Sequence, residues 1–184
     1  MIETERLLLR PARPPDIPAL IDYYTENQAH LTPWEPRWPE GFFTEVFWRA
    51  QLARFAEQAH AGGALRLVMV PRADHKRVIG SVNFTAIQHG ALEASQLGYG
   101  LAAAEQGKGY MFEALKAAIE HIFAELGLHR VMAGYMPANA RSARVLGRLG
   151  FVIEGYARDY MLVNGRWEDH ILTSLVNPDW RPRR

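Results

Sequence analysis

The sequence predicts a single α/β domain, in which a twisted, mixed and mostly antiparallel sheet carries helices on its flanks. Strand-like and helix-like segments alternate along 184 residues, the length of one ordinary domain. Antiparallel hairpins come first, and one strand–helix–strand unit follows them. The chain shows no internal repeat, low-complexity run or linker, so residues 1–184 are expected to form one domain.

The segments before residue 62 predict a strand and two helices. Arg6–Ala12 holds three leucines and ends at a proline, which indicates a strand. Asp16 is a candidate helix cap, because apolar residues follow it at helical spacing. Three prolines exclude regular structure from Leu31–Gly41. A long amphipathic helix is expected over Thr44–Ala61, where a Gly-Gly pair ends it.

Three strands are expected next. Leu65–Pro71, Arg77–Ile87 and Ala94–Leu101 are rich in apolar and β-branched residues, and short polar or glycine-containing turns separate them.

A long helix, a strand and a short helix follow. From Tyr110, apolar residues recur at helical spacing until Gly127 stops the pattern. Arg130–Met136 predicts a strand, and a short helix is expected between Asn139 and Gly150.

The last part of the chain, Phe151 to Val176, predicts two or three strands. The Asn164-Gly165 pair within it is a strong hairpin signal. The sheet should therefore hold about seven strands.

Composition narrows the function classes. The net charge is +1, so the overall charge of the chain gives no reason to expect binding to nucleic acid or to a membrane surface. The absence of cysteine excludes disulfides, thiolate catalysis and zinc–thiolate sites. The amino terminus does not resemble a signal peptide. A cytoplasmic protein is expected, with Arg181–Arg184 as a flexible tail.

The stretch between the fourth strand and the long helix, Gln106 to Gly109, resembles a phosphate loop. A Walker A loop needs a glycine where Ala102 stands and a hydroxyl residue after Lys108, where Gly109 stands. A dinucleotide fingerprint fails because its third glycine is replaced by Ala103. Backbone N–H groups at a helix start bind a pyrophosphate without metal, although the glycines equally suit a plain turn.

A second segment completes a pattern. Gln106 and Gly109 before a long helix, with the N-x-x-S-x-x-x-L-x-x-x-G-F stretch from Asn139 to Phe151, resemble the GNAT superfamily of N-acetyltransferases. The superfamily usually has a small residue where Met111 stands. "LTPWEP", "GKGYMFEAL" and "EGYARDYMLVNGRWEDHILTSL" resemble the Rim-type enzymes that acetylate the N-terminal alanine of a ribosomal protein, and the RimJ branch most of all.

The resemblance implies the GNAT fold, with a sheet splayed at its middle strands and acetyl-CoA in the gap. No metal is implied. Main-chain groups of the strand end would hold the pantetheine arm, the loop would hold the pyrophosphate, Asn139 would bond the arm, and Ser142 would donate to the departing sulfur. The implied cofactor-binding residues are Tyr99, Gly100, Leu101, Gln106, Gly107, Lys108, Gly109, Tyr110, Met111, Asn139 and Ser142.

Each of these roles has a plainer alternative. Tyr99 equally fills space between layers, Asn139 equally caps a helix, and Ser142 equally faces solvent. Glu35, in the Pro-Trp-Glu-Pro stretch, is the candidate general base, with Glu154, Asp169 and His170 as rivals. Glu35 also suits a residue that grips the positive amine.

Three functions stay open on the sequence alone. The first is acetylation of a protein N-terminus, on a ribosomal protein. The second is acetylation of a small amine, an amino acid or an antibiotic, because acceptor loops diverge while a fold persists. The third is a non-catalytic acyl-CoA-binding assembly factor. The chain is compatible with a monomer or a homodimer.

Overall fold

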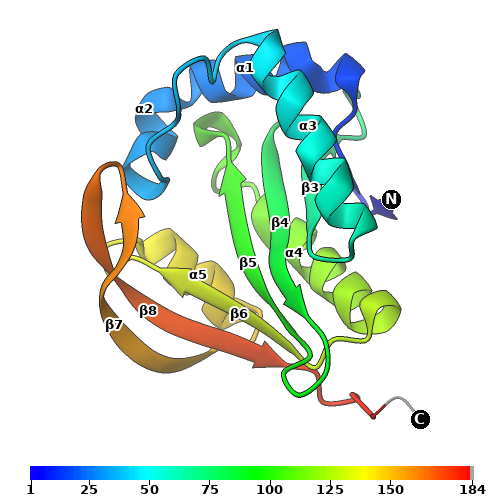
Figure 1. The fold of residues 1–184 in the computed structure, drawn as a ribbon, viewed down its shortest axis with the longest axis vertical. Helices are drawn as coiled ribbons and strands as arrows, with labels where there is room; N and C mark the ends of the chain where they lie inside the picture. The colour runs from blue at the N-terminus through cyan, green and yellow to red at the C-terminus, as the bar shows by residue number, and fades with distance from the viewer. Residues whose placement is uncertain (183–184) are drawn as a thin grey trace.

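The computed structural model describes residues 1–182 and has one eight-stranded sheet with helices on both faces (Figure 1). The strand order is β1-β2-β3-β4-β5-β6-β8-β7, and every neighbouring pair is antiparallel except β5–β6. The strands are β1 (Ile2–Glu3), β2 (Leu7–Arg10), β3 (Leu65–Pro71), β4 (Gly80–Gln88), β5 (Ala94–Leu101), β6 (Arg130–Tyr135), β7 (Val152–Val163) and β8 (Arg166–Val176). This confirms the predicted fold class, with β1 as an additional short strand.

Four of the five helices lie where the sequence predicts them, and α2 (Gln28–Leu31), a single turn, was not predicted. The other four are α1 (Ile17–Glu26), α3 (Glu45–His60), α4 (Tyr110–His121) and α5 (Ala140–Arg148). A π-helical turn, Ile122–Leu126, extends α4 to Gly127, whose positive φ of 64° ends it. Asp16 is the N-cap residue of α1, as predicted, but its side chain makes no capping hydrogen bond to that helix. Its carboxylate accepts a hydrogen bond from the N–H of Arg13 and pairs with Arg10, so it closes the 3₁₀ turn before the helix.

Alternate residues of the central strands face two separate cores. Leu67 and Met69 of β3 face the core beneath α4, while Val68 and Val70 face the core beneath α1 and α3. Because both faces are covered, the side chains of the central strands are buried. The elements described next lie at the edge of this buried centre.

β5 and β6 part soon after they begin. They pair in parallel only where Ala94–Gln96 runs beside Arg130–Met132. Beyond these rungs the two strands diverge, and Figure 1 shows them pointing apart. On its other side β5 stays paired with β4 up to Leu101. The edge of β5 that faces β6 is therefore free over its second half.

The β7–β8 hairpin reaches across the opening to the loop after α2 (Figure 1). The N–H of Asn164, at its tip, donates to the carbonyl of Glu35 over 3.0 Å. The predicted Asn164-Gly165 turn is confirmed, with both residues at positive φ. The stretch Leu31–Gly41, predicted to lack regular structure, begins with the last residue of α2 and a 3₁₀ turn, Thr32–Trp34, and has no helix or strand from Glu35 to Gly41.

Two further points concern the chain as a whole. No helix in residues 1–182 is both long enough and apolar enough to cross a membrane. Of the expected flexible tail, Arg183 and Arg184 lie outside the described residues, and the expectation stays a prediction.

Candidate active site

A cavity of about 460 Å³ lies beside the end of β5. The end of β5, the start of α4, one face of α5 and the segment from α2 to Glu35 surround it. Eleven of the twelve residues predicted for the site line it: Glu35, Tyr99, Gly100, Leu101, Gln106, Gly107, Gly109, Tyr110, Met111, Asn139 and Ser142. The topology thus brings together three separate parts of the chain, at residues 35, 99–111 and 139–142.

The start of α4 is built to present backbone N–H groups. Gly107 and Gly109 have positive φ angles of 76° and 83°, which other residues adopt only with strain. Gly109 is the N-cap, and no side chain caps the helix there. The first N–H groups of α4 therefore face the cavity at the positive end of the helix dipole, an arrangement that suits an anion.

Ion pairs outside the cavity brace this loop. The Lys108 ammonium donates to Glu105 over 2.9 Å, and the Lys108 carbonyl accepts from Arg6 over 2.9 Å. Arg6 in turn pairs with Glu113. Hydrogen bonds from Lys108 and then Arg77 hold the pKa of the Glu105 carboxyl below its usual value. Lys108 is the one predicted site residue that does not line the cavity, because Glu105 holds its side chain elsewhere.

Met111 stands where a small residue is usual. Its side chain packs against the core beneath α4 and also lines the cavity. The larger residue is accommodated by the core, and its N–H still belongs to the first turn of the helix.

Asn139 organises the start of α5. Its side-chain oxygen accepts the N–H of Ser142 over 3.1 Å, so it is the N-cap of this helix. Asn139 and Ser142 both line the cavity as well. Asn139 is therefore both the N-cap of α5 and a residue of the cavity wall.

Tyr99 brings a buried hydroxyl to the cavity. Its Oη is inaccessible to solvent and has no hydrogen-bond partner among residues 1–182. Burial raises the pKa of Tyr99 to about 12, against a smaller opposing effect of the nearby Ser142 hydroxyl. Tyr99 therefore stays protonated at neutral pH, and an unpaired buried hydroxyl costs stability unless a ligand satisfies it.

Glu35 supplies the carboxylate. Burial raises its pKa, and a 2.7 Å hydrogen bond from the Trp38 indole opposes that rise. The carboxylate lies close to the end of β5, since a Cβ placed on Gly100 would be 3.7 Å from its Oε1 and 3.2 Å from the Tyr23 hydroxyl. A side chain at position 100 would therefore have to displace the Tyr23 hydroxyl by a few tenths of an ångström.

The matching family model, an acetyltransferase (GNAT) domain, covers residues 6–152 of the chain. The chain belongs to the GNAT acetyltransferase family. The enzyme is thus an N-acetyltransferase, and the sequence-based resemblance is confirmed.

Relatives within the GNAT family match along nearly the whole chain. The [Ribosomal protein uS5]-alanine N-acetyltransferase of Escherichia coli is 44% identical over 183 residues, covering 100% of this chain and 94% of that protein. The probable N-acetyltransferase YjcK of Bacillus subtilis is 32% identical, covering 97% of this chain and 98% of that protein.

Two solved GNAT structures share the fold closely. The ribosomal-protein-S5-alanine acetyltransferase of Vibrio fischeri has a TM-score of 0.92 at 40% identity, and the match covers 98% of each chain. Mycobacterium smegmatis RimJ, in complex with CoA-disulfide, has a TM-score of 0.86 at 30% identity, covering 92% of this chain and 81% of that one.

The rival base candidates lie away from this GNAT cavity. Glu154 pairs with Arg130 and accepts from Ser174, Asp169 bonds Tyr156 and the N–H of Asp159, and His170 is buried against Tyr160. Asp169 lines a separate surface cavity on the β7–β8 hairpin. Glu35 is the one of the four that lines the cavity beside β5. No group of three or more His, Asp or Glu side chains within residues 1–182 is arranged to hold a metal ion.

Eight residues that line this GNAT cavity were not among the predicted site residues: His30, Leu31, Trp34, Phe112, Arg141, Arg144, Val145 and Arg148. The side-chain amide of Gln106 donates through its Nε2 to Nε2 of His30 over 2.9 Å, and this bond links α2 to the glycine loop. Arg141, Arg144 and Arg148 line the cavity from α5. Their spacing of three and four residues was a readable signal, because it places them on one helix face. The His30 contact depends on the tertiary fold and left no local signal.

Proposed function

We propose that the protein transfers the acetyl group of acetyl-CoA to the N-terminal amine of a ribosomal protein, at an N-terminal alanine. One observation carries the proposal: a single cavity joins an uncapped helix start, a free strand edge and the half-buried carboxylate of Glu35. The likeness to ribosomal-protein alanine acetyltransferases along the whole chain supports this acceptor. A ribosomal acceptor also implies action in the cytoplasm.

The structure offers a place for each part of acetyl-CoA. The pyrophosphate is bound by the N–H groups at the start of α4. The pantetheine arm carries amides and lies along the free edge of β5, from Tyr99 to Leu101, as an additional strand would. This leads the thioester to Ser142 and to the Tyr99 hydroxyl.

The transfer needs a neutral amine and a stabilised thiolate. An N-terminal amine has a pKa of about 8, so part of it is neutral at physiological pH. The amine nitrogen attacks the thioester carbon, its proton passes to Glu35 directly or through water, and the carbon–sulfur bond breaks. The hydroxyl of Ser142 or Tyr99 donates a hydrogen bond to the departing thiolate and keeps its proton, and the proton taken up by Glu35 then passes to the thiolate or to solvent.

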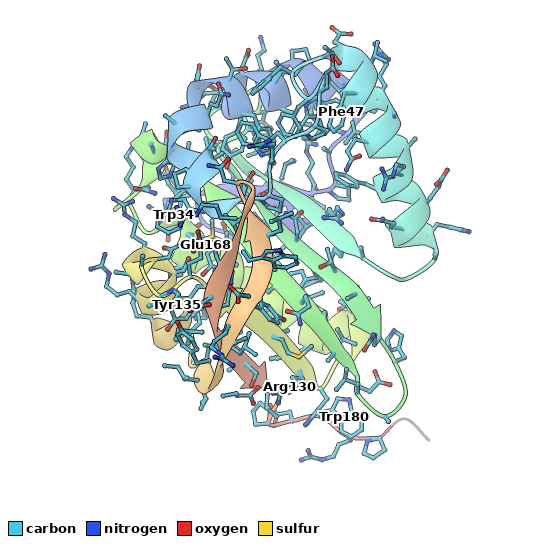
Figure 2. The ribbon with its side chains drawn as sticks, turned by 60° about the vertical axis from the view of Figure 1, so that its left-hand side comes forward. Trp34, Phe47, Arg130, Tyr135, Glu168 and Trp180 are labelled. Carbon is cyan, nitrogen blue, oxygen red and sulfur yellow. The ribbon has the colours of Figure 1, made fainter. Side chains whose placement is uncertain are left out.

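The open mouth of the cavity suits a peptide acceptor better than a small amine, which would need an enclosed pocket. Trp34 lines the cavity yet is 36% exposed, so the cavity opens to solvent beside an aromatic ring. In Figure 2 Trp34 lies just past α2, in the segment that meets the β7–β8 hairpin. An extended N-terminus entering here would bring its amine toward Glu35.

Mass spectrometry tests the acceptor. Purified protein and acetyl-CoA are incubated with amino-terminal peptides of ribosomal proteins and, separately, with a panel of small amines. Acetylation of an alanine-initiated peptide at its α-amine is expected, and Ser142→Ala should slow turnover more than it weakens acetyl-CoA binding. Acetylation confined to small amines would establish the alternative acceptor class. A Ser142 variant that is inactive yet keeps the cellular role would indicate an assembly factor.

A further inference from the structure

The cavity-facing side of α5 carries three guanidinium groups that the transfer chemistry does not use. Arg141, Arg144 and Arg148 recur at the spacing of one helix face, and all three are exposed. None forms an ion pair with a carboxylate anywhere in residues 1–182. The chain as a whole has a net charge of only +1, so this concentration of positive charge is local.

Arg141 is unfavourably placed for the helix itself, whereas Arg148 lies in the last turn, where a cation is favourable. Arg141 lies in the first turn of α5, where the helix dipole is positive, and that turn holds no acidic residue. A cation at this end destabilises a helix. The N-terminus of α4 lines the same cavity and adds a second positive region. An anion bound between the two helices would remove this repulsion.

One anionic group of the cofactor remains without a partner in the proposed function. The α4 N-terminus accounts for the pyrophosphate. Coenzyme A also carries a 3′-phosphate on its ribose, a phosphomonoester of about two negative charges near pH 7. A guanidinium matches phosphate oxygens with two parallel N–H bonds, which makes arginine the suited residue.

Arg148 is already held in place for such a contact. Its guanidinium lies 4.2 Å above the ring of Phe112, the third residue of α4. Stacking occupies the face of the guanidinium and leaves its edge N–H groups free to donate. Phe112 itself lines the cavity, so the stacked pair stands beside the helix start that faces the pyrophosphate.

We propose that this arginine face of α5 binds the 3′-phosphate of coenzyme A and makes the enzyme select 3′-phosphorylated acyl-CoA over the dephosphorylated form. The inference rests on the proposed function, because it assigns a second anion subsite in the same cavity. Binding of an acidic acceptor segment by the same arginines is the competing explanation.

Isothermal titration of the whole protein with CoA and with 3′-dephospho-CoA tests the subsite without any acceptor. Wild-type protein should bind CoA about 10- to 100-fold more tightly, as expected for charge-assisted hydrogen bonds. In the triple variant Arg141→Gln, Arg144→Gln, Arg148→Gln, that ratio should fall to near one, with 3′-dephospho-CoA binding unchanged. Glutamine is chosen because it keeps helix propensity. A second triple variant, Arg141→Gln, Arg144→Lys, Arg148→Gln, keeps one positive charge and should show part of the wild-type ratio.

Arg49→Gln is the matched control, because Arg49 is an exposed helix arginine on α3, paired with Glu45. It should leave both affinities unchanged. Equal binding of the two compounds by wild type would overturn the 3′-phosphate subsite alone, and so would a triple variant that changes only the KM of the acceptor. Failure to bind either compound would overturn the proposed function, and the subsite with it.

Discussion

At Glu35, two opposing effects set the charge of the carboxyl group. Burial raises its pKa, and the hydrogen bond from Trp38 limits the rise. A base works only when deprotonated, so activity should increase as pH rises through this raised pKa. It should increase again near pH 8, where the acceptor amine loses its proton. Both limbs are measurable as kcat/KM against pH.

Replacing Glu35 separates the two limbs. Glu35→Gln should lower kcat/KM by about 100-fold, the smaller end of the range for general bases, and should leave only the amine limb. Glu154→Gln, which removes a carboxylate outside the cavity, should leave the profile intact. An unchanged lower limb in Glu35→Gln would contradict the assignment.

The same shift predicts an effect on stability. Because the folded pKa lies above the unfolded one, Glu35 contributes stability below its unfolded pKa and loses it as pH rises through the folded pKa. Glu35→Gln should therefore gain stability relative to wild type above that window, and chemical denaturation at acidic and neutral pH will show it.

The Tyr99 hydroxyl gives a second prediction at this scale. It is buried without a partner, so Tyr99→Phe should not destabilise the fold. If the hydroxyl donates to the thiolate or the thioester carbonyl, kcat should fall by about 100-fold, as for a removed oxyanion donor. Tyr160→Phe, outside the cavity, is the control. Lower stability with an unchanged kcat would show that Tyr99 only fills space.

Among the elements, the glycine loop before α4 depends on backbone conformation. Gly107 and Gly62 both have positive φ angles, 76° and 71°, with nothing within 4 Å of an added Cβ. An alanine at either site should therefore cost about 1–2 kcal/mol from strain alone. Gly107→Ala should also weaken CoA binding several-fold, because it moves the N–H groups of the loop. Gly62→Ala should not, and equal CoA affinities would argue against an anion loop.

The elements also show what sequence patterns can and cannot predict. Leu65–Pro71 and Ala94–Leu101 have the predicted ends, because proline, glycine and polar turns bound them. β1 was missed, since two residues carry no periodicity. Lys108 was predicted to line the cavity and does not. Its ammonium group is held by Glu105, and its carbonyl by Arg6, which is distant in sequence. Local patterns predicted the elements and most of the cavity lining, whereas ion pairing between distant segments was not readable.

For the whole molecule, cofactor binding should appear as thermal stabilisation. A ligand that binds only the folded state adds about 2.7 kcal/mol at 100 times its Kd. For a protein of 184 residues, this corresponds to a rise in Tm of about 5–10 °C. Differential scanning fluorimetry with CoA will measure it. No rise at saturating CoA would contradict the proposed binding site.

The short β5–β6 pairing has a consequence for the protein without its cofactor. Where the strands diverge, the sheet has two interior edges whose main-chain groups lack a neighbouring strand. Unpaired edges are templates for association with other chains. A pantetheine arm lying along β5 would cover the edge of that strand. The cofactor would then reduce aggregation in addition to donating the acetyl group. Cofactor-free preparations should accordingly aggregate sooner on storage than those kept with CoA.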